Sequence, residues 1–557
     1  MKPVKPFHKA CAVLLAVMLA SSFAACGDSG TIPSSQGAGS PTASESKADP
    51  SSEEQPAAQD GPWAKYDTPV TLTRAQQISS ATQWPDGDSP EDNVWIRDAL
   101  DTFNIKLEDY WSVDNSQYAQ KINVSIASND LPDVFTVDSA QLQQLIKSGM
   151  IADLTDVYEA NASDQLRAVM DADSVGFESG KSNGRLMALS QQHFGVISMF
   201  NSLWIRQDWM DALGLEAPQT MADLENICYR FVHDDPDGNG VDDTYGLGVD
   251  KWIYQLYYLM AGFDAYPLSW LRDANDQIVF GGVQPEVKNA LGTFQKWYQN
   301  GILNKEFGIE DGAKLTEDLV SGKVGVYVQR SWFGFSPGID VVKRNGEEAI
   351  FMPYAIPSVE GGAAKAGLDW PVNSYTVVSK NCKNPEAVIR MMNLYVDRTS
   401  KDYATYMDGD IGWGASPFTV NNPMADYNQF VNISEAENTR DTSKLTPDQL
   451  GKYNNVIKWI DEKDPDAVGA YCQVSSAGAY SVFKPMVDSH NYVMTEYRGV
   501  ATPTMTQKQS SLDTLYAEEI TKIIMGAPLD DFDKLVEKWN TLGGSDITKE
   551  MNEMLNP

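Results

Sequence analysis

The chain has 557 residues, with 43 lysines and arginines against 77 aspartates and glutamates, and a formal net charge of −34. Such a surface repels nucleic acid and anionic lipid headgroups, so both are excluded as partners of the folded part. It argues more weakly against a strongly anionic ligand such as a polyuronate. The apolar fraction of 42% and the 14 tryptophans indicate a well-packed globular protein.

The first 25 residues predict an export signal. Three lysines precede an apolar run from Ala10 to Phe23, which is shorter than the roughly 18 to 20 residues of a membrane-spanning helix. Small residues then lead into Cys26, a pattern similar to a bacterial lipobox, in which Cys26 would be lipidated and become the mature N-terminus. An ordinary signal peptide cut after Ala25 is the alternative. Without the signal the mature chain has 40 basic and 77 acidic residues, a net charge of −37.

Residues 27–62 are rich in Ser, Gly, Pro, Ala and Glu and predict a disordered linker. About 490 residues follow from Trp63, too many for one core and enough for two lobes of ordinary domain size. Cys228, Cys382 and Cys472 are an odd, sparse set that cannot form a disulfide framework.

Helical and strand-like patterns alternate along the globular part, which predicts an α/β fold. An amphipathic segment from residue 118 stops near Asn129, and the apolar strand Val134–Val137 follows and ends at Asp138. Ligands of open α/β sheets gather at the carboxyl ends of strands, so Asp138 is a candidate for ligand binding.

The next clear passage covers residues 183–215. Asn183 and Gly184 form a hairpin-type turn, strand-like runs flank the pair Gln191 and Gln192, and a helix begins near Gln207. A polar pair between two apolar strands often faces a cleft, so Gln192 is a second candidate.

The acidic stretch after a helix expected over Met221–His233 has the spacing of the front half of a calcium loop. Oxygen ligands stand at alternate positions, and a glycine at the sixth position permits the bend. The expected ligands are Asp235, Asp237, Asn239, the carbonyl of Val241, and Asp243. Gly246 stands where a sensor loop has a bidentate glutamate, so we expect a structural Ca²⁺ without a switch. A metal-free acidic turn is the alternative.

Several tryptophans lie in turn-like contexts flanked by glycine or proline. Each of these rings is expected either to pack against the core or to bind a ligand. Flat rings beside Asp, Asn, Gln and Arg are the groups that a sugar requires. Core or interface burial is the alternative for any one of them. The expected stacking residues are Trp332, Trp370 and Trp413, then Trp252 and Trp270, with Trp84 also a candidate. Asp138, Gln192 and Arg330 are the expected hydroxyl-binding residues.

Other tryptophans follow helical patterns and are assigned to the core: Trp95, Trp204, Trp209, Trp297 and Trp539. The last belongs to a C-terminal helix whose core residues recur at helical spacing and which should stop at Gly543 and Gly544. These core residues are Phe532, Leu535, Val536, Trp539 and Leu542. Cys228 shares a helical face with Leu224, Ile227 and Phe231, so we expect it to be buried.

Catalytic signatures are missing from the mature chain. His193, His233 and His490 do not have zinc-ligand spacing, and there is no nucleophile-elbow motif. The glycines around residues 176–182 are spaced one residue too closely for a phosphate loop. A spatial pair of carboxylates, as in glycoside hydrolases, remains open because 77 acidic residues offer many pairs.

Together these stretches resemble the extracellular solute-binding lipoproteins of ABC importers, in particular the large oligosaccharide-binding type. The similarity lies in the lipobox and in segments that come in the family order: 118–135, 202–224, 235–246, 377–397, 497–505 and 521–552. It implies a two-lobed, periplasmic-binding-protein-like (type II) α/β fold that closes over its ligand by hinge motion. It also implies calcium on the loop at Asp235, and it does not specify the sugar.

The expected organisation follows from this resemblance. Residues 1–25 are the signal and 26–66 the lipid anchor and linker. Lobe one is expected to hold 67–200 with about 371–440, and lobe two 201–370 with about 441–557. The crossovers are expected near Met199–Ile205 and Trp370–Val377.

The expected function is capture of an oligosaccharide by a non-enzymatic, monomeric protein. It would be lipid-anchored outside the cytoplasmic membrane and would deliver the sugar to a permease powered by a separate ATPase. Ligand contacts from both lobes would favour the closed form. Two alternatives stay open: an exported carbohydrate-active enzyme that uses a carboxylate pair, and a binding protein for a peptide or another solute.

Overall fold

The computed structural model describes residues 61–555, apart from 79–83, 86, 173, 193–194, 403–404, 407–415 and 417. Within this part of the chain, the two larger sheets each carry helices on both faces. The first has the strand order β2-β1-β3-β14-β6, in which β1 runs parallel to β2 and β3, and β14 runs antiparallel to both its neighbours. Its strands are β1 (Val70–Ile78), β2 (Ile105–Asp114), β3 (Val134–Val137), β6 (Leu189–Gln192) and β14 (Val372–Val378).

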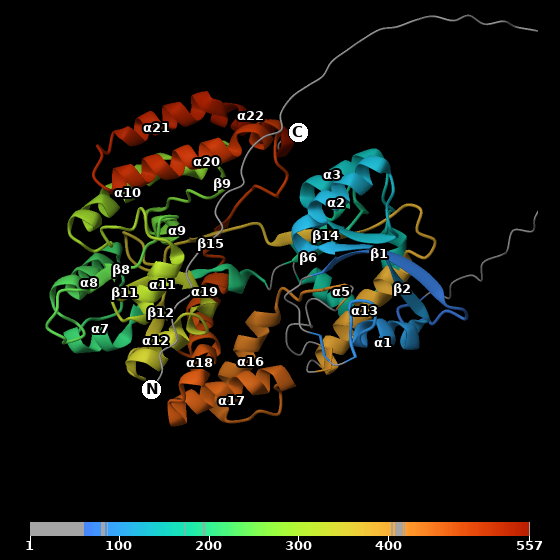
Figure 1. The fold of residues 1–557 in the computed structure, drawn as a ribbon, viewed down its shortest axis with the longest axis horizontal. Helices are drawn as coiled ribbons and strands as arrows, with labels where there is room; N and C mark the ends of the chain where they lie inside the picture. Colours follow the sequence, from blue (N-terminus) through green and yellow to red (C-terminus); the bar gives the residue numbers. More distant parts are fainter. Residues whose placement is uncertain are drawn as a thin grey trace, which may run out of the picture. The chain divides into compact units, whose positions relative to one another are not determined.

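Helices α2 and α3 cover one face of this sheet, and α1, α5 and α13 cover the other (Figure 1). Successive residues of a strand point to opposite faces, so Val134 enters the core under α1 while Phe135 enters the core under α2. The helices are α1 (Val94–Phe103), α2 (Asn115–Ser128), α3 (Ser139–Ser148), α4 (Thr155–Asn161), α5 (Asp164–Asp171), α6 (Ser174–Ser179) and α13 (Glu386–Lys401).

The second sheet has the order β12-β7-β11-β8, in which β7 runs antiparallel to both neighbours and β8 runs parallel to β11. On β7, Leu203 and Ile205 enter one core while Trp204 enters the core on the opposite face. Each sheet therefore lies between two apolar layers. The strands are β7 (Asn201–Arg206), β8 (Tyr245–Leu247), β11 (Val324–Arg330) and β12 (Phe351–Tyr354).

The helices around the second sheet divide between its two cores. One core receives α7 (Gln207–Leu213), α8 (Met221–His233), α9 (Tyr254–Leu259), α10 (Pro285–Gln299), α20 (Pro503–Ile524) and α21 (Asp531–Trp539). The other core receives α11 (Gly312–Val320), α12 (Gly338–Asn345), α16 (Ala425–Thr439), α17 (Pro447–Glu462), α18 (Val468–Val474) and α19 (Ala479–Asp488). Figure 1 shows α20 and α21 side by side near the C-terminus.

Three two-stranded sheets hold the remaining strands of the described residues. They are β4 (Lys181–Ser182) with β5 (Arg185–Leu186), β9 (Trp270–Arg272) with β10 (Ile278–Phe280), and β13 (Ala366–Leu368) with β15 (Tyr492–Met494). The first pair confirms the predicted hairpin, because Asn183 and Gly184 between its strands have φ of 50° and 75°.

Local signals explain most element boundaries. The predicted strand Val134–Val137 and the helix beginning at Gln207 are confirmed. Helix α8 begins after Thr220, whose side chain accepts from the Asp223 N–H in a capping box. It buries Leu224, Ile227, Cys228 and Phe231 on one face, as the spacing predicted.

In the part of the chain that the structure describes, the chain passes between the two sheets and their helices at three places, the third between Phe418, which packs in the core of the first sheet, and Ala425. Strand β6 ends at Gln192 and β7 begins at Asn201, while the return lies between Leu368 of β13 and Val372 of β14. Helix α16 packs in the core with Trp204 and α17 to α19, so from Ala425 the chain lies with the second sheet. The lobe boundary expected near 440 stays a prediction.

The C-terminal helix breaks at Gly543, one of the two glycines at which its end was predicted. Helix α21 ends at Trp539, and after Asn540–Gly544, where the helical backbone breaks at Gly543 with a φ of 143°, α22 (Ser545–Leu555) follows. Leu542 lies next to this break and is 45% exposed, so its assignment to the core is wrong. The five tryptophans assigned to the core are all buried, as predicted.

The three described cysteines are free thiols, and two of them, Cys228 and Cys472, are buried. Among the described residues, no helix combines the length and the apolar character needed to cross a membrane.

Candidate ligand-binding site

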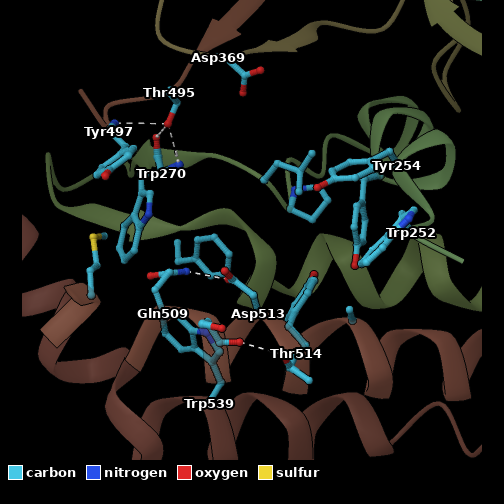
Figure 2. Close-up of a pocket in the computed structure, with 18 of the residues that line it drawn as sticks. Trp252, Tyr254, Trp270, Asp369, Thr495, Tyr497, Gln509, Asp513, Thr514 and Trp539 are labelled. Carbon is cyan, nitrogen blue, oxygen red and sulfur yellow. Dashed lines mark hydrogen bonds between the residues drawn. The ribbon is translucent and has the colours of Figure 1, made fainter. Parts of the chain in front are cut away.

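A pocket of about 1320 Å³ opens beside α9 and α20 (Figure 2). This volume exceeds the roughly 300 to 1,000 Å³ that is typical of sites for drug-sized molecules. The residues that carry its aromatic and polar surface are Lys251, Trp252, Tyr254, Tyr257, Trp270, Phe280, Asp369, Trp370, Thr495, Tyr497, Gln509, Ser510, Asp513, Thr514, Tyr516, Glu518, Thr521, Lys522 and Trp539.

Segments that are far apart in the sequence build this pocket. The turn before α9 and the helix itself supply one wall, and one face of α20 supplies the floor. Asp369, Trp370 and Val372 come from the segment that returns to the first sheet. Figure 2 shows Trp252 and Tyr254 at one end and Trp270 and Tyr497 at the other, with Gln509 and Asp513 between them.

One end of the pocket is a fixed aromatic stack. The Trp539 ring lies 5.1 Å from Phe280 at an interplanar angle of 14°, and Phe280 lies 5.3 Å from Trp270. Gly544 permits this placement, because a Cβ on that residue would stand 2.0 Å from the Trp539 ring. Trp270 and Trp539 are buried and Phe280 is partly buried, so the stack forms a rigid apolar end of the pocket.

The other end carries open aromatic surface. Trp252 is 60% exposed and Tyr254 is 50% exposed, although both line the pocket. The Lys251 ammonium lies over the Trp252 ring, 5.4 Å from its centroid. Large exposed rings of this kind mark surfaces that bind a partner or a ligand.

Trp370 stands where the chain returns to the first sheet. The Arg498 guanidinium lies over its ring at 5.4 Å, and the ring packs in part against the core under α2. Its indole N–H is buried and has no hydrogen-bond acceptor within the protein. Trp370 and Val372 thus join a pocket whose other lining residues come mainly from the elements around the second sheet.

Polar groups on the floor and upper wall converge on the same space. On α20, the Gln509 amide donates to Asp513 Oδ1 at 2.7 Å, and burial raises the pKa of Asp513. The Thr495 hydroxyl accepts from the Trp270 N–H at 3.1 Å, which positions β9 against the segment 495–499. Carboxylate, amide and hydroxyl groups beside ring faces can hold the hydroxyls and the apolar face of a sugar ring.

The structure brings together three of the predicted stacking residues and separates two others. Trp252, Trp270 and Trp370 line the pocket, although Trp270 is only 5% exposed. Trp84 packs against the core of the first sheet, and Trp332 is 46% exposed but is not among the pocket-lining residues. Trp413 and the predicted lipidation site Cys26 lie outside the described residues.

The predicted hydroxyl-binding residues lie around the pocket. Asp138 caps α3 by accepting from the Gln141 N–H, and together with burial its nearby carboxylate raises the pKa of the pocket residue Tyr497. Gln192 pairs through its backbone with Val372, which lines the pocket.

Arg330 ends β11 and reaches the pocket indirectly, because its guanidinium lies 3.6 Å from the pocket-lining carboxylate Asp369. Sequence reasoning missed several lining residues, among them Tyr254, Tyr497, Gln509 and Asp513. It placed Trp539 in the core, where the residue is indeed buried, but one edge of its ring also lines the pocket. Among the lining residues, only the aromatic ones could be recognised from the sequence as candidates for ligand binding. The polar residues of an amphipathic helix such as α20 cannot be distinguished from its solvent-exposed face.

The acidic loop after α8 folds on itself. Gly240 N–H donates to Asp235 Oδ2 at 3.1 Å, and Asn239 Nδ2 donates to Asp237 Oδ2 at 2.7 Å. Burial and the carboxylates of Asp235 and Asp243 raise the pKa of Asp237. Across the described ranges, no three His, Cys, Asp or Glu side chains are gathered as a metal site.

Comparison with known proteins places the chain in a family. A model of the bacterial extracellular solute-binding protein family matches residues 86–400. Lipoprotein LipO of Bacillus subtilis is 22% identical over 494 residues, covering 84% of this chain and 90% of LipO. The fructooligosaccharide ABC transporter substrate-binding protein FusA of Streptococcus pneumoniae is 33% identical over 239 residues, covering 39% of this chain and 43% of FusA.

A similar solved structure is that of the alginate-binding protein AlgQ2 without calcium ion. It superposes with a TM-score of 0.55 at 17% identity, covering 88% of this chain and 99% of AlgQ2. The match confirms the predicted two-lobed α/β fold of the solute-binding proteins. With the family model spanning more than half of its length, the chain belongs to the bacterial extracellular solute-binding protein family.

Proposed function

We propose that this protein captures an oligosaccharide in the pocket between α9 and α20 and delivers it to an ABC permease driven by a separate ATPase. The observation that carries the proposal is the pocket itself, which has open rings at one end, buried rings at the other and polar groups between them. Its volume suits a ligand of several sugar rings. FusA, a relative, is named for fructooligosaccharide transport.

The expected ligand is neutral. The lining holds both signs of charge, with Lys251 and Lys522 against Asp369, Asp513 and Glu518. A polyuronate would bring a carboxylate on every ring into a protein of net charge −34. Hydroxyl groups can use the carboxylates as acceptors without this repulsion.

Isothermal titration calorimetry tests the proposal directly. Purified protein is titrated with kestose, maltotriose and cellotriose as neutral ligands and with trigalacturonate as the anionic comparison. Saturable binding of a neutral sugar supports the proposal, and the Trp252→Ala variant should weaken it. Binding of trigalacturonate alone would contradict the neutral ligand, and binding of peptides alone would support the peptide alternative.

The carbohydrate-active enzyme differs from the binding protein in one measurable result. An enzyme with a carboxylate pair would release new reducing ends from the bound sugar, whereas a binding protein returns it intact. Prolonged incubation of the sugar that binds, followed by a reducing-end assay, separates the two.

The calcium loop belongs to the same proposal as a structural element. Asp235, Asp237, Asn239 and Asp243 with the Val241 carbonyl form an oxygen donor set that Ca²⁺ prefers. Burial and the carboxylates of Asp235 and Asp243 raise the pKa of Asp237, and a divalent cation would offset both the burial of its charge and the repulsion. The ion would stabilise the turn after α8 and take no part in sugar contacts, because none of these residues lines the pocket.

The N-terminus would tether the folded part outside the cytoplasmic membrane. Lipidation of Cys26 would leave residues 27–66 as a linker between the lipid and the first strand, and the protein would act as a monomer. A Cys26→Ser variant should appear in the culture medium instead of the membrane fraction. Retention of that variant on the membrane would contradict the lipid anchor.

A further inference from the structure

Two buried carboxyl groups face each other behind the wall of the pocket. Glu310 precedes α11 and is 8% exposed, and Asp318 on α11 is 7% exposed. The two side chains lie within hydrogen-bonding reach of each other. Two buried carboxylates at such a distance cannot both be ionised without a large cost.

The surrounding groups satisfy Asp318 but leave one oxygen of Glu310 without a donor. Lys314 Nζ lies 2.9 Å from Asp318 Oδ1, and the Tyr245 hydroxyl of β8 donates to Asp318 Oδ2 at 3.2 Å. Asn304 Nδ2 donates to Glu310 Oε2, while Glu310 Oε1 is buried and has no hydrogen-bond partner in the protein. A proton on Oε1 would turn it into the donor that this contact lacks.

Electrostatics favours the protonated form of Glu310. Burial is the largest cause that raises the pKa of Glu310, followed by the hydrogen bond and the charge of Asp318, and the Glu306 carboxylate adds to them. These effects outweigh the opposite effect of the Lys314 ammonium, so the pKa of Glu310 rises to about 7. The shared proton is therefore present in mildly acidic solution and is lost as the pH rises through neutrality.

The backbone of Glu310 holds the turn that carries Trp252. The Lys251 N–H donates to the Glu310 carbonyl at 2.8 Å, and the Trp252 N–H donates to Asp250 Oδ1 at 3.0 Å. We call residues Asp250–Ile253 the Trp252 turn. In this turn the buried, β-branched Ile253 has a φ of 50°, a strained conformation that persists only when its surroundings hold it.

We propose that Glu310 and Asp318 share one proton and thereby position the Trp252 turn at the open end of the pocket. Loss of that proton places two negative charges together behind the turn and weakens the segment that restrains it. The consequence for ligand affinity rests on the proposed function of the pocket, whereas the consequence for the turn does not. Glu310 acts here as a positioning residue.

Hydrogen exchange of the ligand-free protein tests the turn by itself. Exchange of the peptide covering residues 250–258 is followed by mass spectrometry from about pH 5.5 to about pH 8.5 and corrected for the intrinsic effect of pH. In the unsubstituted protein, exchange should become about tenfold faster as the pH rises through neutrality. A factor of ten is the change that a difference of one pKa unit between the closed and the opened turn would produce. In Glu310→Gln it should stay constant, because the amide N–H replaces the shared proton.

Two further variants keep the test decisive. Glu317→Gln removes the same charge from α11 at a side chain that is 68% exposed, so it should follow the unsubstituted protein. In Asp318→Asn the new amide N–H supplies the missing donor from the Asp318 side of the pair. This variant takes the place of Glu310→Gln if Glu310→Gln does not fold. Exchange that is independent of pH in the unsubstituted protein, or equally dependent in Glu310→Gln, would overturn the proposal.

Calorimetry with the neutral sugar that binds then tests the consequence for the ligand. The Kd should rise several-fold from about pH 6 to about pH 8 in the unsubstituted protein and stay level in Glu310→Gln. If exchange of the Trp252 turn increases with pH but no oligosaccharide binds, the proposal for the carboxyl pair is supported and the proposed ligand is rejected. A level Kd beside a loosening turn would show that Trp252 does not contact the ligand, and the link to affinity would fail.

Discussion

Replacing Trp252 with alanine should weaken sugar binding without unfolding the protein. A tryptophan side chain offers roughly 250 Å² of surface. Because Trp252 is 60% exposed, about 150 Å² of it is open, and a sugar ring stacked on one face would cover about half of that area. At about 25 cal/mol per Å² the loss is about 2 kcal/mol, which corresponds to about a 25-fold increase in Kd.

Calorimetry with the neutral sugar that binds measures this change, and urea unfolding measures the stability. The free energy of unfolding should change by less than about 0.5 kcal/mol, because the ring is mostly solvated in the free protein. Trp332→Ala is the matched control, since Trp332 is 46% exposed and lies outside the pocket lining. An unchanged Kd in Trp252→Ala, or an equal loss in Trp332→Ala, would refute the assignment of the pocket.

The remaining predictions concern the buried ring stack, the acidic loop and the thiols. Trp539→Ala should lower the free energy of unfolding by about 3 to 5 kcal/mol in urea, because the ring is 3% exposed and stacks on Phe280; a loss below about 1 kcal/mol would contradict its role in the core. Calcium should raise the Tm in a thermal unfolding assay and should not do so in Asp237→Ala, since an ion that binds the folded state alone stabilises it; an equal rise in both would place calcium elsewhere. Cys228 and Cys472 should not react with a thiol reagent at about pH 8 unless urea is added, because burial raises the pKa of Cys472 to about 12 and that of Cys228 above its usual range; rapid modification of the folded protein would contradict their burial.

The sequence by itself determined the local elements that depend on short-range chemistry. The strand Val134–Val137 follows from its β-branched and aromatic residues, the hairpin at Asn183 and Gly184 from their tolerance of positive φ, and α8 from its cap and its apolar face. These signals act within a few residues and need no partner from elsewhere in the chain. The family resemblance added the fold class, which the structural comparison confirmed.

The tertiary structure decided which residues meet. Gln509 and Asp513 look like the polar face of an exposed helix until α20 packs beside β9 and α9 and turns that face into the floor of a pocket. The same packing places Trp539 in a ring stack with Phe280 and also at the edge of the pocket. Trp332 and Trp252 were both predicted to stack on a ligand, and only the path of the chain separates the first from the pocket and brings the second to it. Contacts between residues hundreds of positions apart depend on how the layers pack, and local sequence patterns do not encode that packing.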